Sequence, residues 1–374
     1  MRIGFDAKRA FNNHTGLGNY SRFVIDSLLT FFPQYDYYLF TPGFDSQLKD
    51  YFAPRSNLHI ISPEGIIDKT FASAWRSLGL VKELEKYKID VFHGLSNELP
   101  NGIEQTNIKS IVSVHDLIFL RYPDYYNNID AYIYKKKFRN ACEHATHIVS
   151  ASEQTKQDII SYFNTNPLKI SVVYQDCDKQ FYEKQSDLKK EYVIKKYGLP
   201  EQFFLTVGTI EKRKNQLSIL KAIASLRNVS IKLVIVGKAT DYKKQLEEFI
   251  ITNDIQEQVT FVPKIDFADL PAMFQLAKCS IYISEFEGFG IPVLEALRCE
   301  VPNIASNVSS IPEVAGEAAL LCSPTDVQTL AKHISEVHSN PSLRLELIEK
   351  GKLQSLKINP QHIAEDLINI YETK

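Results

Sequence analysis

Short apolar runs rich in β-branched residues alternate with longer helical patterns along the whole chain. A strand that leads through a helix to the next strand returns to the same sheet in parallel. The alternation therefore predicts an α/β fold built on parallel sheets. In the first half of the chain the predicted strands are 3–6, 37–40, 91–93, 110–114, 147–150 and 170–173, and the predicted helices are 17–30, 72–85, 125–144 and 153–163.

A polar and charged stretch, residues 176–199, separates this series from a second one of the same kind. The 374 residues exceed one ordinary domain and suit two. We therefore expect an N-terminal Rossmann-like domain of residues 1–175, a linker of residues 176–199 and a C-terminal Rossmann-like domain of residues 200–355. The second series has predicted strands at 203–207, 232–236, 259–261, 280–283, 303–305 and 319–321. Its predicted helices are 216–226, 242–251, 268–276, 293–298, 327–338 and 342–350, and a last helix, 360–371, has Asn359 as its N-cap.

The composition excludes some classes of function. The formal net charge is -2, so no general affinity for nucleic acid is expected. Five cysteines, an odd number without C-x-x-C spacing, favour a reducing compartment over disulfides or a zinc site. The first residues lead straight into a strand and no apolar run reaches about 18 residues, so we expect neither a signal peptide nor a membrane span. These features favour a cytoplasmic protein.

The turn that follows the predicted strand 280–283 is the most distinctive local feature. It contains Gly288 and Gly290 and leads into a helix. Glycines let the backbone come close to a ligand, and the N-terminus of a helix favours an anion. Glu287 in the turn and Glu295 in the helix are carboxylates beside this anion site, so we interpret them as partners of hydroxyl groups. A phosphate next to hydroxyl groups suggests a sugar nucleotide.

Two adjacent cations, Arg213 and Lys214, follow the first predicted strand of the second series. Cations are unfavourable at the start of a helix, so we expect a negative group to compensate them. A diphosphate is a natural partner, because arginine binds it bidentately and lysine binds it as a point charge. The alternative interpretation is a solvated basic turn.

Two glycines, Gly16 and Gly18, open the first long helix and suit a phosphate or a closely approaching sugar. Their spacing is similar to G-x-G-x-x-G, but Ser21 stands in place of the third glycine. The motif also comes about ten residues after its strand, whereas the dinucleotide fingerprint needs the turn directly, which disfavours a dehydrogenase. The alternative is a loop that simply needs flexible glycines.

A histidine and an aspartate, His115 and Asp116, stand at the end of the predicted strand 110–114. At this position His115 could contact a substrate hydroxyl or transfer a proton. The alternative is a histidine that Asp116 holds for structure.

The helix around Tyr132–Arg139 mixes aromatic residues with four cations. Such a helix could rest on anionic lipid headgroups as a peripheral contact with the inner membrane surface. The favoured alternative is an ordinary surface helix with a solvated basic face.

Together, these motifs resemble the retaining glycosyltransferases of family 4, which have the GT-B fold. The resemblance runs the full length of the chain, and its most specific part is the pair Glu287 and Glu295, which matches the E-x7-E motif of that family. The other matching segments are 1–7, 15–20, 114–117, 151–153, 207–211, 213–215 and 312–319. The resemblance implies two Rossmann-like domains that face each other across a cleft. It also implies that the last segment, 356–374, crosses back to the N-terminal domain.

The resemblance implies a role for each candidate residue of the second half. Glu287 lies at the donor sugar and Glu295 holds the ribose hydroxyls. Arg213 and Lys214 neutralise the leaving diphosphate. The backbone N–H groups that face the sugar and the phosphate are those of Phe289, Gly290 and Ile291, beside Gly288 in the same turn.

In the first half, the resemblance implies that His115 sits near the reacting carbon of the sugar. Gly16 and Gly18 border the phosphates and the acceptor from the other domain. The family needs no metal, and this chain has no D-x-D pair beside a strand, so no metal and no cofactor are expected. The expected partners are a nucleotide-sugar donor and a glycan or polyprenyl-linked acceptor.

The chain departs from the family pattern at three places. Residues 174–178 stand where the family usually has Gly-Val-Asp, so the hinge is in doubt; Asn359 and Pro360 replace a frequent aromatic segment; and Thr209 follows Gly208 where a basic residue is frequent. This variant is similar to bacterial mannosyltransferases that build O-antigen or capsule. We therefore expect a retaining, metal-independent hexosyltransferase that uses GDP-mannose in bacterial surface polysaccharide synthesis.

Several alternatives remain open at this stage. A UDP-sugar-dependent transferase of the same family and a sugar-nucleotide epimerase share the fold. A retaining glycoside hydrolase also uses two carboxylates, but it does not need a cation loop for a diphosphate. A non-catalytic sugar-nucleotide binder should have lost Glu287, Arg213 or Lys214. The donor sugar, the acceptor, the linkage and the oligomeric state stay undetermined by the sequence.

Overall fold

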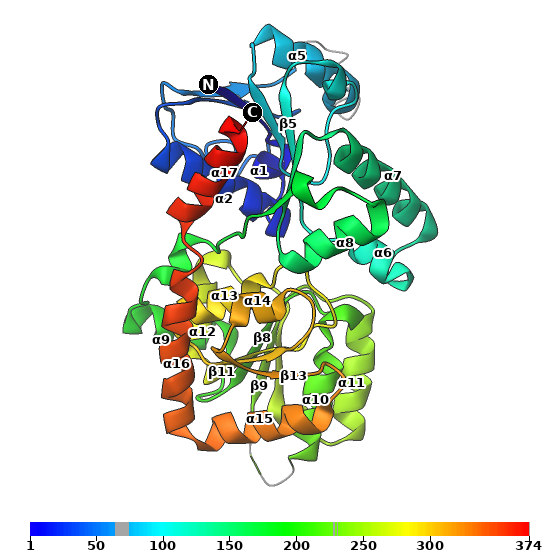
Figure 1. The fold of residues 1–374 in the computed structure, drawn as a ribbon. Coiled ribbons are helices and arrows are strands. Elements are labelled where there is room, and N and C mark those ends of the chain that lie inside the picture. The colour runs from blue at the N-terminus through cyan, green and yellow to red at the C-terminus, as the bar shows by residue number, and fades with distance from the viewer. Residues whose placement is uncertain (64–74, 227–228, 230, 374) are drawn as a thin grey trace. The chain divides into compact units, whose positions relative to one another are not determined.

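The computed structural model describes residues 1–63, 75–226, 229 and 231–373 (Figure 1). This part of the chain forms two compact units, one of Met1–Asp176 with Ile358–Lys374 and one of Cys177–Lys357. Each unit is built on a parallel sheet, which confirms the predicted α/β class with two Rossmann-like domains.

The sheet of the first unit has the strand order β3-β2-β1-β4-β5-β6-β7, and all its pairs are parallel. The order reverses between β1 and β4, because the chain builds outward to β3 and then returns to the other side of β1. The strands are β1 (Arg2–Asp6), β2 (Asp36–Phe40), β3 (Leu58–Ile61), β4 (Val91–Gly94), β5 (Lys109–Val114), β6 (His147–Ser150) and β7 (Ile170–Val172).

The sheet of the second unit repeats this plan with the order β10-β9-β8-β11-β12-β13. Its order reverses between β8 and β11, which pair in parallel. The strands are β8 (Phe204–Val207), β9 (Leu233–Val236), β10 (Val259–Val262), β11 (Cys279–Tyr282), β12 (Asn303–Ser306) and β13 (Ala319–Cys322).

Helices follow most of the strands in both units, although β2 leads to β3 without one. In the first unit they are α1 (Lys8–Asn12), α2 (Gly16–Phe31), the π-helix η1 (Trp75–Gly79), α5 (Leu80–Lys86), α6 (Ile118–Arg121), α7 (Asn128–His144), α8 (Glu153–Phe163) and α17 (Pro360–Glu372). In the second unit they are α9 (Asp187–Tyr197), α10 (Gln216–Ser225), α11 (Tyr242–Thr252), α12 (Leu270–Leu276), α13 (Ile291–Arg298), α14 (Ile311–Ala315), α15 (Val327–Ser339) and α16 (Pro341–Leu356).

The core of the second unit shows why these segments read as strands. Leu233 and Ile235 of β9, with Ile281 of β11, are completely buried among the helices that cover the sheet. A strand covered on both faces becomes a nearly continuous apolar run, which is the pattern found in the sequence.

Every predicted strand is present within one residue of its predicted bounds. The edge strand β3 was missed, although three of its four residues are apolar; as an edge strand it is only partly buried. Most predicted helices are also present. The predicted helix 72–85 begins outside the described residues, and its described part consists of η1 followed by α5.

The stretch 176–199, which we expected to be a linker, contains the helix α9. This helix packs against α12 within the second unit. Asp269, which is almost fully buried, accepts a hydrogen bond from the Tyr197 hydroxyl at 2.8 Å and pairs with Lys196 at 2.7 Å. The charges that suggested a solvated linker instead tie α9 to the start of α12.

The last helix, α17, lies beside α2 in the first unit (Figure 1). Its N-cap is Asn359, as predicted, because the Asn359 side chain accepts hydrogen bonds from the backbone of Gln361 and His362. The Tyr371 hydroxyl lies 2.6 Å from Nδ1 of the buried His93, which connects α17 to β4. No helix in the described ranges combines the length and the apolar character that a membrane span requires.

Candidate functional site

The loop after β8 carries the two predicted cations. It begins at Gly208, whose φ of 144° lies in a region that L side chains rarely adopt. The loop then forms a short 3₁₀ helix, Lys212–Lys214, and Asn215 in the left-handed conformation leads into α10. This path brings Arg213 and Lys214 to the carboxyl end of the sheet, beside the loop that follows β11.

The loop after β11 runs from Ile283 to Gly290 and carries Glu287. Gly290 is the residue before the first turn of α13 and has a φ of 108°, which explains the glycine there. The first N–H groups of a helix have no partner within the helix, so those at Gly290 and Ile291 stand at the positive end of α13. The predicted glycine turn is therefore present as a loop that opens a helix.

Arg213 and Lys214 both bind Glu287, although the loops are far apart in sequence. The Glu287 carboxylate lies 2.7 Å from Nζ of Lys214 and 2.8 Å from the guanidinium of Arg213. Arg213 also pairs with Glu211 at 2.6 Å and donates to the carbonyl of Phe286 at 2.7 Å. In this structure, the negative group that compensates the two cations is thus Glu287 together with Glu211.

This charge cluster is nearly closed to solvent, so its electrostatics are strong. Burial alone would raise the pKa of Glu287, but the charges of Lys214 and Arg213 outweigh it and lower that pKa to about 2. Burial lowers the pKa of Lys214 below its usual value, and Glu287 opposes this change. Glu287 is therefore ionised at neutral pH and accepts hydrogen bonds.

Ser309 and Ser310, to which the sequence pattern assigns no definite role, brace the Glu287 turn. The Ser309 hydroxyl accepts a hydrogen bond from the backbone N–H of Glu287 at 3.1 Å. The Ser310 hydroxyl lies 3.0 Å from the carbonyl of Glu287 and 2.9 Å from that of Phe289. Ser309 has a left-handed φ of 55°, which marks an unusual loop, but a backbone angle is known only from the structure.

Tyr282 and Ser284 were missed by sequence reasoning. The Tyr282 hydroxyl accepts a hydrogen bond from Nζ of Lys214 at 2.6 Å, and the Ser284 hydroxyl binds the Glu287 carboxylate and the carbonyl of Arg213. Both residues lie in or next to β11, where their periodicity is that of an ordinary buried strand. Sequence pattern alone could not separate them from the core.

Glu295, one helical turn inside α13, is buried but differs from Glu287 in its surroundings. No described residue donates a hydrogen bond to its carboxyl group, although only 7% of the residue is exposed. Burial, with a smaller contribution from the charge of Asp178, raises the pKa of Glu295 to about 8. Most of this group is therefore protonated at pH 7, and its hydrogen-bonding capacity is not used by the described protein.

The charged residues of this cluster lie where the strand order of the second unit reverses. Arg213 and Lys214 follow β8, and Glu287 follows β11, its neighbour in the sheet. In open α/β sheets, ligands bind outside the carboxyl ends of the strands at such a switch point. The topology thus supports the interpretation of this cluster as a ligand site.

The predicted site residues of the first half lie in the other unit. His115 follows β5 and is buried; its Nε2 atom lies 2.9 Å from the carbonyl of Leu95, so Nε2 carries the proton and donates. Burial lowers the pKa of His115 to about 4, although the bond to Leu95 opposes this change. His115 is therefore neutral at physiological pH, and its Nδ1 atom has no hydrogen-bond partner among the described residues. Asp116 binds the backbone N–H of Ile118 at 3.1 Å.

The two glycines that open α2 have different surroundings. A Cβ atom at Gly18 would lie 1.8 Å from the backbone oxygen of Asn13, so the loop requires a glycine there for packing. A Cβ atom at Gly16 would meet no atom of the described residues within 4 Å. The packing of the loop is therefore enough to explain the glycine at position 18. At Gly16 the space is open, so a ligand could approach the backbone there.

The helix α7 presents the predicted basic and aromatic face. Ile129, Tyr132 and Ile133 are 73%, 69% and 42% exposed. With the exposed Lys136 they stand at positions i, i+3, i+4 and i+7 of the helix, so they share one helix face. The opposite face packs into the core through Ala141 and Cys142.

Among the described residues, no group of three or more His, Cys, Asp or Glu side chains is arranged to hold a metal ion.

Two family models match the chain. Residues 33–178 match Glycosyltransferase Family 4, and residues 189–354 match Glycosyl transferases group 1. The two matched ranges fall one in each sheet-containing half of the chain.

Curated relatives include two bacterial mannosyltransferases. The O-antigen chain mannosyltransferase B of Escherichia coli is 28% identical over 293 residues, which cover 77% of this chain and 76% of that protein. The O-antigen chain mannosyltransferase RfbU of Salmonella typhimurium is 28% identical over 230 residues, which cover 62% of this chain and 61% of that protein.

Solved structures share the fold at lower identity. Sucrose-phosphate synthase from Thermosynechococcus elongatus has a TM-score of 0.78 at 18% identity, covering 99% of this chain and 98% of its own. Anabaena HepE in complex with UDP has a TM-score of 0.76 at 16% identity, covering 99% of both chains. These similarities establish the fold as that of GT-B glycosyltransferases.

Proposed function

Because the chain belongs to the glycosyltransferases of family 4, we propose that it transfers mannose from GDP-mannose, with retention, to a hydroxyl group of a glycan or polyprenyl-linked acceptor. The product is a bacterial surface polysaccharide such as O-antigen. The observation that carries the proposal is the buried cluster of Arg213, Lys214 and Glu287 at the switch point of the second sheet. The two mannosyltransferase relatives support the choice of sugar.

The cluster offers each part of a sugar nucleotide a chemically suitable partner. Arg213, Lys214 and the N-terminus of α13 provide positive charge for the diphosphate. Glu287, ionised and buried, accepts hydrogen bonds from hydroxyl groups of the sugar. Glu295, whose carboxyl group has no described partner, accepts those of the ribose.

The donor must compete for the cations that Glu287 holds in this structure. Lys214 and Arg213 both contact the Glu287 carboxylate from the side of the β8 loop. When a diphosphate binds, these cations share their hydrogen bonds between it and Glu287. Fixed cations cost no reorganisation when charge develops on the leaving group, which is why they stabilise the transition state.

In the proposed reaction, the bond between C1 of the hexose and the diphosphate oxygen breaks. The acceptor oxygen bonds to C1 on the same face, and the departing phosphate oxygen takes the acceptor's proton. This balance needs no protein base, no metal and no cofactor. His115, neutral and with Nδ1 open, accepts a hydrogen bond from a hydroxyl of the donor sugar, and Gly16 borders the bound substrates.

We propose further that the protein works in the cytoplasm, where nucleotide sugars are made, and that it touches the inner membrane surface through α7. The exposed Ile129, Tyr132 and Ile133 beside lysines suit the boundary between headgroups and acyl chains. A polyprenyl-linked acceptor would lie in the same membrane.

A thermal-shift panel with GDP, UDP and ADP, followed by their sugar conjugates, tests the donor. We expect GDP and GDP-mannose to raise the unfolding temperature more than the other ligands, because binding to the native state alone stabilises it. If only UDP compounds stabilised the protein, the donor would be a UDP-sugar instead of GDP-mannose. Conversion of the bound sugar nucleotide without any acceptor into an isomeric sugar nucleotide would indicate an epimerase.

A further inference from the structure

The first unit has a switch point of the same kind as the second. Its strand order reverses between β1 and β4, as that of the second unit reverses between β8 and β11. The segments after β1 and β4 therefore occupy the position at which an open α/β sheet binds ligands. Two carboxylates stand at this edge of the sheet. Asp6 is the last residue of β1, and Glu98 comes four residues after the end of β4.

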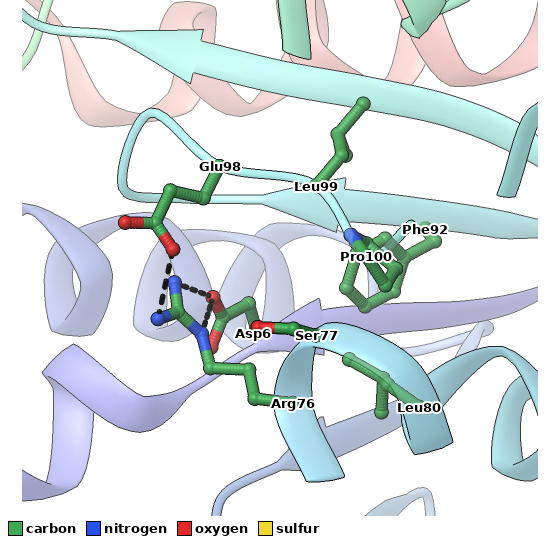
Figure 2. Close-up of a pocket in the computed structure, with 8 residues that line it drawn as sticks. All are labelled: Asp6, Arg76, Ser77, Leu80, Phe92, Glu98, Leu99 and Pro100. Carbon is green, nitrogen blue, oxygen red and sulfur yellow. Dashed lines mark hydrogen bonds and ion pairs between the residues drawn. The ribbon is translucent and has the colours of Figure 1, made fainter. Parts of the chain in front are cut away.

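Arg76 connects these two carboxylates. Figure 2 shows its guanidinium between the two carboxylates. It lies 2.6 Å from Asp6 and 3.1 Å from Glu98. Asp6 is almost fully buried, and the Arg76 side chain is only 15% exposed. Glu98 also pairs with Lys137 of α7 at 3.1 Å. Burial raises the pKa of Glu98, but Arg76 and Lys137 outweigh it and hold that pKa below its usual value.

A small hollow opens beside this cluster. It is lined on one side by Asp6, Arg76 and Glu98 and on the other by apolar side chains that include Leu80 and Phe92 (Figure 2). The space open to the centre of a water-sized molecule is ≈ 10 Å³. A space of this size holds about one water molecule, so it also suits one hydroxyl group of a larger ligand.

The loop that carries Glu98 is held in a special conformation against His115. The carbonyl of Leu95 accepts the Nε2 proton of His115, and Oδ1 of Asn97 accepts the backbone N–H of His115 at 2.9 Å. Asn97 has a φ of 64°, a left-handed conformation that is uncommon in residues other than glycine. The hydroxyl of Ser96, a residue only 6% exposed, has no hydrogen-bond partner in the described part of the chain. The loop therefore joins the hollow to the histidine assigned to the donor sugar.

Arg76 itself lies in the π-helix Trp75–Gly79. Such helices are rare, occur mostly as single turns, and are frequently found at functional sites. The loop that carries Glu98, the π-helix and the buried charges thus meet at the switch point of the first sheet.

We propose that Asp6, Arg76 and Glu98 bind one hydroxyl group of the acceptor sugar, and so help to decide which acceptor is used. The proposal rests on the glycosyltransferase function proposed above. An ionised carboxylate has about four lone-pair positions, so Asp6 and Glu98 keep acceptor capacity beyond their bonds to Arg76. The three residues bind and orient the hydroxyl; they transfer no proton.

The test compares Arg76→Lys with a matched control, Arg121→Lys. Arg121 also pairs with a buried carboxylate of the first unit, that of Asp158, but it lines no part of the hollow. The assay measures transfer of radiolabelled mannose from GDP-mannose to a lipid extract of the producing bacterium. In parallel, it measures slow hydrolysis of the donor without acceptor. Thermal unfolding is recorded for each variant.

We expect Arg76→Lys to raise the KM for the acceptor about 10- to 100-fold, the cost of a lost hydrogen bond to a charged group. Donor hydrolysis and the KM for GDP-mannose should stay within about twofold of the wild type, and Arg121→Lys should change neither KM. A purely structural ion pair would instead lower the unfolding temperature and reduce transfer and hydrolysis together. That result, or an unchanged acceptor KM, would overturn the proposal.

Synthetic acceptors that each lack one hydroxyl group provide a second readout. The wild type should discriminate against one of them, and Arg76→Lys should lose that discrimination, because the two changes remove the same contact. Equal discrimination by both proteins contradicts the proposal. A wild-type protein that neither binds nor hydrolyses any nucleotide sugar would refute the proposed function itself, which is a distinguishable outcome.

Discussion

Nζ of Lys214 lies 2.7 Å from the Glu287 carboxylate, although the two residues are 73 positions apart in the chain. The pair joins the loop after β8 to the loop after β11, the two strands that meet where the sheet order reverses. Both side chains are nearly buried, so replacing either partner by water would cost free energy. The pair therefore sets the electrostatics of the candidate donor site before any ligand arrives.

Replacing Lys214 by methionine should lower kcat with GDP-mannose about 100- to 1,000-fold, because it removes a fixed cation from the leaving diphosphate. Steady-state assays of GDP release measure this effect. Lys212→Met is the matched control, because Lys212 is an exposed cation in the same 3₁₀ turn. A similar loss in both variants would mean that general loop charge, rather than Lys214, matters.

Glu287→Gln should change how stability depends on pH. In the wild type, the folded pKa of about 2 lies below the reference value of 4.5. The stabilisation from ionised Glu287 is therefore present above pH 4.5 and is lost as the pH falls toward 2, a change of about 3 kcal/mol. The destabilisation caused by Glu287→Gln should be largest near pH 7 and shrink in acid. Urea unfolding between pH 2.5 and 7 measures it, and a constant difference across this range would contradict the assignment.

Glu295 should make nucleotide binding pH-dependent. Its pKa of about 8 in the free protein means that the carboxyl group must lose a proton to accept hydrogen bonds from both ribose hydroxyls. GDP affinity should therefore rise between pH 6.5 and 8.5, by up to about tenfold per pH unit. Calorimetry in buffers of different ionisation enthalpy would detect the released proton. Glu295→Gln should weaken binding and abolish this release, and Asp178→Asn should shift the profile to lower pH.

The two glycines that open α2 should respond differently to alanine. Gly18→Ala should destabilise the protein by about 1–3 kcal/mol, because its Cβ atom meets the backbone oxygen of Asn13. Gly16→Ala has open space and should not destabilise it. If Gly16→Ala keeps full stability in thermal unfolding but loses transfer activity, Gly16 borders a substrate. If the variant keeps full activity, Gly16 is not part of the site.

Membrane contact by α7 predicts binding to anionic vesicles. The double variant Lys135→Glu with Lys136→Glu should bind vesicles of phosphatidylcholine and phosphatidylglycerol at least about tenfold more weakly in a flotation assay, since each basic residue contributes about 1 kcal/mol. Lys244→Glu with Lys332→Glu, two exposed lysines of the second unit, is the control. Equal binding of both variants, or no binding of the wild type, argues against this contact.

Much of the fold could be predicted because its signals are local. Buried parallel strands are short apolar runs, and Leu233–Val236 is recognisable without any partner. The edge strand Leu58–Ile61 and the helix Asp187–Tyr197 were missed for the opposite reason. Both depend on neighbours, β2 in one case and α12 in the other. The strand is a run of only four residues, too short to identify by itself, and the helix has a weak apolar pattern.

The candidate site was predictable in part for the same reason. The positions of Arg213, Lys214 and Glu287 directly after strands could be found from periodicity and spacing. That Ser309 and Ser310 brace the Glu287 turn, and that Arg76 joins Asp6 to Glu98, could not be found in this way. These contacts join segments that are remote in sequence, and the residues involved have no distinctive local pattern.

The sequence by itself determined the alternation of strands and helices and the residues that each loop offers at the end of its strand, because both depend on short-range spacing. Only the tertiary structure decided which loops meet. β11 pairs with β8 although β9 and β10 come between them in the chain, and this order brings the cations of one loop to the carboxylate of the other. Buried next to each other, these charges hold the pKa of Glu287 far from its usual value, which no isolated segment could do.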